Sequence, residues 1–245
     1  MSLPLALVAL VALTAPLAVT LSACESSQSK NEKLASSAGS LQEEKGVNAG
    51  AANTNVSAGD VALITDENGS AVAVELRNKG SKPQLDVPVI IDVKSKSGEL
   101  LFTNGTPGLQ RTLTHASVVP ADSKTYWVND QVFASEPPAK VDVKVGASDS
   151  KLTITPPKFT IESISLVEDP VNGLAAVGKV GNTTGEEQRK ILVSVVGERA
   201  GKVVAIGRGI VNKIKADKSG KFTVFFIGSP KGAKLNANAQ ATELK

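Results

Sequence analysis

The chain has few of the residues from which metal and nucleophilic sites are most often built. Its 245 residues include one cysteine, Cys24, and one histidine, His115. A zinc site needs several Cys or His ligands, and an intrachain disulfide needs two cysteines. We therefore predict no metal, no cofactor and no disulfide, and a folded part that is held together by burial.

Aromatic residues and net charge are also scarce. Aromatics make up 3% of the chain, so a core must be built mainly from Val, Ile, Leu and Ala. The 27 Lys and Arg residues nearly balance 24 Asp and Glu residues, and this balance is too weak to indicate a nucleic-acid partner. The sequence has no Gly-x-Ser-x-Gly nucleophile motif. We expect His115 to be an ordinary surface histidine at a strand edge rather than part of a triad, and the protein not to be an enzyme.

The N-terminus contains a long apolar run. Residues 3–21 have no charged side chain and lead into Leu21-Ser22-Ala23-Cys24. An apolar stretch that ends in small residues is typical of a secretory signal peptide. These four residues resemble the lipobox of bacterial lipoproteins. The resemblance implies that a signal peptidase recognises Leu21, Ser22 and Ala23, that cleavage occurs before Cys24, and that the Cys24 thiol receives a diacylglyceryl group.

Two other interpretations of this segment stay open. The apolar run is close to the roughly 20 residues that span a bilayer, which would make it a retained transmembrane helix. A lone cysteine can also be a small buried hydrophobe. Pro4 and Pro16 interrupt a helix, and this favours a cleaved signal peptide over residues 1–23. We therefore expect lipid on Cys24 to hold the protein at the extracytoplasmic face of the cell membrane.

Residues 24–58 follow as the lipidated cysteine and a polar segment. Ser, Ala, Gly, Asn, Glu and Lys dominate it, and such a composition buries too little apolar surface to offset the entropy of ordering. We predict a flexible tether with a typical reach of roughly 30–35 Å.

From residue 59 onward the apolar residues alternate with smaller or polar ones, a pattern typical of half-buried strands. Residues 87–91 align with residues 191–195, 104 positions later, and at the same offset Asn78 aligns with Asn182. We interpret residues 59–150 and 158–245 as a tandem repeat. Units of roughly 90 residues with six to eight short strands are typical of immunoglobulin-like (Ig-like) β-sandwiches. The predicted fold class is all-β, with Pro156-Pro157 as a short semi-rigid joint between two sandwiches.

The second unit resembles the FxLYD-type Ig-like modules of bacterial secreted proteins. The resemblance lies in the order of residues 178–182, 191–196 and 201–204, that is, strand, Asn, turn, apolar strand and Gly-Lys-Val-Val. The Phe-x-Leu-Tyr-Asp signature is missing, and residues 195–199 occupy its place. The resemblance implies a non-catalytic extracytoplasmic domain.

Several segments are candidates for contact with a partner. Residues 102–111 form a longer loop than their counterpart in the second unit, and long loops on rigid sandwiches are common recognition sites, so we select Thr106, Leu109 and Arg111 as candidate contact residues.

The only Tyr and Trp are adjacent, at 126 and 127. One ring should enter the core, and the other should face out or toward the second sandwich. Acidic segments at 66–69 and 168–173 are interpreted as turns, with calcium as the alternative. Four lysines in one turn are either solvated or in contact with anionic headgroups or wall polymers: Lys213, Lys215, Lys218 and Lys221.

The function that these patterns favour is that of a non-enzymatic, lipid-anchored envelope protein. Its Ig-like modules would act as a spacer or as a platform for an envelope protein or a cell-wall polymer. A solute-binding lipoprotein of a transport system is the alternative, although such proteins are usually two-lobed chains with long helices. An envelope hydrolase is a further alternative.

Overall fold

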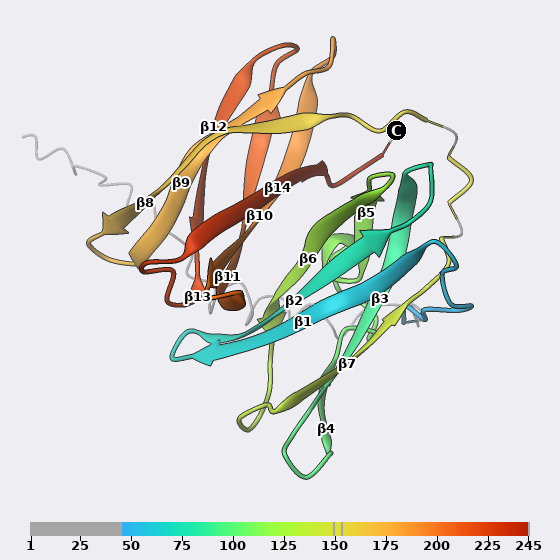
Figure 1. Ribbon diagram of the computed structural model, residues 1–245, viewed down its shortest axis with the longest axis vertical. Helices are drawn as coiled ribbons and strands as arrows, with labels where there is room; N and C mark the ends of the chain where they lie inside the picture. Colours follow the sequence, from blue (N-terminus) through green and yellow to red (C-terminus); the bar gives the residue numbers. More distant parts are fainter. Residues whose placement is uncertain (1–45, 149, 153, 245) are drawn as a thin grey trace, which may run out of the picture. The chain divides into compact units, whose positions relative to one another are not determined.

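The computed structural model describes residues 46–148, 150–152 and 154–244, so Leu21, Ser22, Ala23 and Cys24 lie outside the described residues. The described chain folds into antiparallel sheets with a sandwich-like arrangement (Figure 1), which confirms the predicted all-β fold. Its helical content within these ranges is one 3-10 turn, η2 (Arg111–Leu113). No helix in this part of the chain is long and apolar enough to cross a membrane.

Sandwich 1 comprises the first seven strands. One sheet has the order β1-β2-β6, and in the other β4, β5 and β7 all pair with the long strand β3. Alternate residues of β2 and β3 fill the core between the sheets, because successive side chains of a strand point to opposite faces. The strands are β1 (Val56–Asp66), β2 (Gly69–Asn78), β3 (Gln84–Lys94), β4 (Leu100–Thr103), β5 (His115–Val119), β6 (Ser123–Val132) and β7 (Lys140–Val145).

Sandwich 2 repeats this plan with sheets β8-β9-β12 and β13-β11-β10-β14. Its core contains Ile191, Val193 and Val195 of β10, and Phe222 supplies the large ring that Trp127 supplies in sandwich 1. The strands are β8 (Phe159–Asp169), β9 (Gly173–Asn182), β10 (Gln188–Arg199), β11 (Lys202–Ile214), β12 (Ser219–Phe225), β13 (Ile227–Gly228) and β14 (Lys234–Ala241).

A buried asparagine at the end of β2 and of β9 performs the same task in both sandwiches. The Asn78 amide nitrogen donates to the carbonyls of Lys82, Val119 and Pro120, at 2.9 to 3.1 Å. The Asn182 amide nitrogen has the equivalent carbonyls of Glu186, Ile214 and Lys215 within 2.7 to 3.4 Å. Each side-chain oxygen accepts a backbone N–H two residues later. Because a buried polar group needs partners, each asparagine fastens two turns together at one end of its sandwich.

The two sandwiches also share unusual backbone conformations. Asp86 and Lys190 have φ of 54° and 49°, and Asp122 and Asp217 have φ of 45° and 51°. Positive φ is uncommon and costly for residues other than glycine. Strain at matching positions shows that the repeat extends to the details of the chain path.

The sandwiches pack against each other through the outer faces of two sheets. This contact buries β2 and β10 on both faces, whereas the alternation in the sequence predicted half-buried strands, and for these two strands that prediction was wrong. Small side chains at 71 and 73 allow the sheets to approach. The cluster consists of Ala71, Ala73 and Val128 from sandwich 1 and Val196, Ile206 and Ile227 from sandwich 2.

Candidate interaction surfaces

The loop after β4 is anchored at its root by Asn104. This fully buried side chain accepts the Ile91 N–H at 2.7 Å and donates to the carbonyls of Val89 and Leu113 at 2.8 and 2.7 Å. In sandwich 2 the uninterrupted strand β11 occupies the equivalent place. The longer loop of sandwich 1 thus divides one strand position into β4, η2 and β5, and the buried amide replaces the missing strand pairing.

The three residues selected in this loop have different surroundings. Thr106 is exposed and its hydroxyl donates to the Thr103 carbonyl at 3.4 Å, while Leu109 is half-buried. The Arg111 guanidinium makes a bidentate contact with Asp86, with Nε 2.7 Å from Oδ1. Such a fork geometry orients the guanidinium. An anionic partner at Arg111 would therefore compete with Asp86.

His115 is not the surface residue that the sequence suggested. It is 6% exposed, its Nδ1 lies 2.8 Å from the Thr114 hydroxyl, and its carbonyl accepts the Trp127 indole N–H at 3.2 Å. All of β5 is buried. Part of the reason is β14 of the other sandwich, where Gln240 accepts the Val118 N–H at 3.4 Å.

The adjacent aromatic residues point as the sequence predicted. Trp127 is 4% exposed and lies in the core of sandwich 1. Tyr126 faces sandwich 2, where its hydroxyl donates to Glu198 Oε1 at 2.8 Å. Burial first, and the Glu198 carboxylate second, raise the pKa of Tyr126 well above its usual value. The phenol therefore stays protonated and serves as a donor across the contact.

A second polar contact between the sandwiches involves Arg208 and Asp130. The guanidinium donates to Asp130 Oδ1 from Nε at 2.7 Å and from Nη2 at 2.6 Å. The Arg208 side chain is 7% exposed. Sequence reasoning did not identify this pair. The sequence signal for a contact at this sheet face was the pair of alanines at 71 and 73, because an exposed sheet face would carry polar residues there.

The acidic segments form turns. Asp66 accepts the Asn68 N–H at 2.7 Å and, with its other oxygen, the Gly228 N–H at 2.7 Å. Asp169 accepts the N–H groups of Asn172 and Val171, and these bonds lower the pKa of its carboxyl. Asp side chains commonly cap turns in this way. Within the described ranges, no cluster of three His, Cys, Asp or Glu residues could hold a metal ion.

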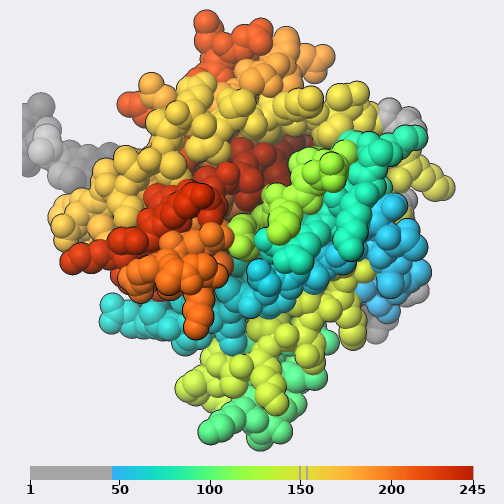
Figure 2. Space-filling model, in the orientation of Figure 1, coloured from blue at the N-terminus to red at the C-terminus, as the bar shows by residue number. Residues whose placement is uncertain are grey.

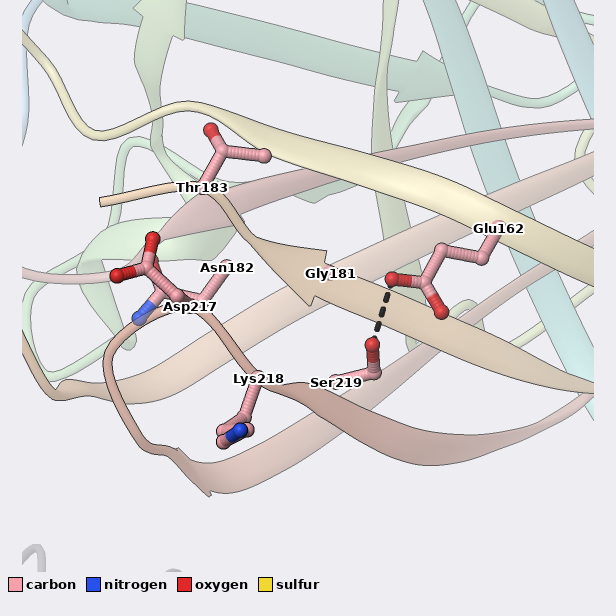
Figure 3. A pocket seen from close by; sticks show the side chains of 7 residues that line it. All are labelled: Glu162, Gly181, Asn182, Thr183, Asp217, Lys218 and Ser219. Atoms are coloured by element: carbon pink, nitrogen blue, oxygen red, sulfur yellow. Dashed lines mark hydrogen bonds between the residues drawn. The ribbon is translucent and has the colours of Figure 1, made fainter. Parts of the chain in front are cut away.

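A shallow hollow of about 280 Å³ lies at the Asn182 end of sandwich 2 (Figure 3). The Ser219 hydroxyl donates to Glu162 Oε1 at 2.5 Å across it. Lys218, from the predicted lysine cluster, belongs to the lining, whereas Lys213 lies 3.9 Å from Glu187. The lining can hydrogen-bond a small polar group. It consists of Glu162, Gly181, Asn182, Thr183, Asp217, Lys218 and Ser219.

Exposed apolar side chains occur at one end of sandwich 1. Leu100 is 53% exposed and Phe133 is 55% exposed. The β3–β4 hairpin and the loop after β6 lie side by side there (Figure 2). A hydrogen bond joins the two segments, in which the Ala139 N–H donates to the Lys94 carbonyl at 2.8 Å. Single exposed apolar residues are normal on protein surfaces.

No protein-family model matches the chain, and no curated protein matches it in sequence.

Proposed function

We propose that this chain is a non-enzymatic, lipid-anchored envelope protein, held through Cys24 at the extracytoplasmic face of the cell membrane. Its two Ig-like sandwiches act as one platform for an envelope protein or a cell-wall polymer. One observation carries the proposal: the Leu21–Cys24 quartet precedes a folded unit in which two sandwiches are fastened together face to face. The resemblance of sandwich 2 to FxLYD-type modules also supports a non-catalytic extracytoplasmic role.

The contact between the sandwiches suits a platform. An apolar cluster joins the two sheet faces, and the Tyr126–Glu198 and Arg208–Asp130 contacts accompany it. Sheets that pack face to face interdigitate as tightly as a protein core. Surfaces on the two sandwiches are therefore held at a fixed spacing, as a binding platform requires.

The last part of the segment that the sequence predicted as a flexible tether, residues 46–58, is ordered on sandwich 1. Residues 51–53 run antiparallel to residues 145–147, where the Asn53 N–H donates to the Val145 carbonyl at 3.0 Å. Further back, Gly46 passes so close to Gly105 that an added Cβ would lie 2.0 Å from the Gly105 oxygen. The loop with Thr106 and Leu109 thus lies beside the entry point. A partner at this loop would bind on the tether side of sandwich 1.

The test is a comparison of wild type with Cys24→Ala in the source cells. Membrane fractionation should place the wild type in the membrane fraction and release the variant. A short-range cross-linker applied to intact cells should join the wild type to an envelope protein or a wall polymer. Failure to enrich any envelope component, together with measured turnover of a substrate by the purified protein, would contradict the proposal.

A further inference from the structure

Among the described residues, no other sheet packs on the outer face of the β8-β9-β12 sheet of sandwich 2. The equivalent face of sandwich 1, on the β1-β2-β6 sheet, packs against sandwich 2. Pairing registers make Ala175 the equivalent of Ala71, and Lys221 the equivalent of Tyr126. In sandwich 1 this face is buried against sandwich 2, whereas here Val167 and Phe225 are 39% and 41% exposed. We call this surface the open face, defined by Val167, Ala175, Val177, Lys179, Lys221 and Phe225.

One half of the open face is apolar. Val167, Ala175 and Phe225 lie in one row across the three strands, and Val177 follows in the next row between Ser165 and Thr223. The small residue in the middle of the first row matches the small Ala71 that lets a sheet approach sandwich 1. Val167 and Phe225 flank Ala175 from β8 and β12, and Ala175 itself is 1% exposed. An apolar row of this kind is suited to packing against another sheet.

The other half carries two lysines, and the Glu162 carboxylate lies further along the same face, beside Gly181 and Ser219. Lys179 and Lys221 lie directly opposite each other on β9 and β12. Like charges in this position destabilise a sheet, and no ion pair between described residues involves either lysine. At the equivalent of Lys221 in sandwich 1, Tyr126 meets the Glu198 carboxylate. A carboxylate in the same relative place on a partner would meet the Lys221 ammonium.

We propose that the open face binds a partner protein through the outer face of a β-sheet that carries branched apolar side chains and a carboxylate. The template is the chain's own contact, in which Val196, Ile206 and Glu198 cover the β1-β2-β6 sheet. This inference rests on the proposed platform function and names the surface that performs it. Charge complementarity selects an acidic partner face, because the open face presents two ammonium groups that form no ion pair with a described residue.

The described residues of a second copy of the chain do not offer such a face. In each copy the sheet surface with Val196 and Glu198 is already covered by its own sandwich 1. The equivalent sheet of sandwich 1 carries charged residues that pair among themselves, Lys94 with Asp142 and Lys144 with Asp92. The occupant is therefore a different protein.

The experiment places photoreactive p-benzoylphenylalanine at position 225 of the full chain in the source cells. The matched control carries the same probe at position 133, another exposed phenylalanine. The expected result is an adduct with one protein at 225 and none with that protein at 133. Mapping of the joined peptides should place the adduct on a strand residue that has a carboxylate neighbour.

Substitutions at Lys221 then test whether its positive charge contributes to the contact with the partner. Lys221→Glu should weaken the adduct roughly tenfold, the size expected for reversing one charge at a contact, and Lys221→Arg should retain it. Replacing the partner's carboxylate with lysine should restore the adduct to Lys221→Glu. No adduct at 225, an adduct with lipid or with a second copy, or indifference to Lys221→Glu would overturn the inference. An adduct made by a probe at Arg111 but not at 225 would leave the platform function standing while this surface fails.

Discussion

Replacing Asn182 with alanine should destabilise the protein by about 3 kcal/mol. The side chain is 2% exposed and lies within hydrogen-bond distance of three carbonyls, one backbone N–H and the Thr184 hydroxyl. Its amide nitrogen has two hydrogens, so two bonds from nitrogen and one from the Thr184 N–H are lost, at about 1 kcal/mol each, while the Thr184 hydroxyl can donate to the Glu186 carbonyl instead. Because Asn78 makes the same backbone contacts, Asn78→Ala should cost the same within about 1 kcal/mol.

Urea unfolding followed by circular dichroism measures both losses, and Trp127, the only tryptophan, reports on the core of sandwich 1. Asn212→Ala, on the exposed side of β11, is the matched control and should change stability by less than about 0.5 kcal/mol. Losses below about 1 kcal/mol for both buried asparagines would refute the reasoning. A large loss for one of them alone would show that the repeat does not extend to the role of this residue.

Two further predictions concern the contact between the sandwiches. The single tyrosine should titrate above its ordinary value of about 10, as measured by tyrosinate absorbance, and Glu198→Gln should lower that pKa. Because the folded pKa is raised, Tyr126 contributes stability below about pH 10 that is lost as pH rises through the folded pKa; a titration at the ordinary value would contradict the Glu198 contact. Arg208→Ala should cost about 2–4 kcal/mol in urea unfolding, because it removes a guanidinium that is only 7% exposed and breaks a buried ion pair. Arg111→Ala removes a guanidinium that is 57% exposed and should cost about 0–1 kcal/mol, and equal losses would show that burial of the arginine does not set the value.

Much of the fold could be predicted from local patterns, because strand alternation and turn residues act over short distances. The alignment of Asn78 with Asn182 was correct, and both residues proved to be buried and to share their partners. The same alternation did not predict that β2 and β10 are buried on both faces. That burial depends on which sheets meet in space, and alanine at 71 and 73 is a weak signal for it.

The candidate sites were harder to predict for the same reason. Position 115 follows polar residues in the sequence, yet His115 is buried, because it begins a strand that pairs with β3 and its carbonyl accepts the indole N–H of the buried Trp127. The Arg208–Asp130 pair joins residues 78 positions apart on different sandwiches, and nothing local connects them. The orientation of Tyr126 and Trp127 could be predicted, because it follows from the strand period alone.

The claim that the platform is lipid-anchored is tested most directly by the intact mass of protein extracted from the membranes of its source cells. Wild type should begin at Cys24 and carry the mass of a diacylglyceryl group, with or without a further acyl chain. Cys24→Ala should lack that added mass. A wild-type protein without lipid, or one that keeps residues 1–23, would contradict lipid anchoring at Cys24.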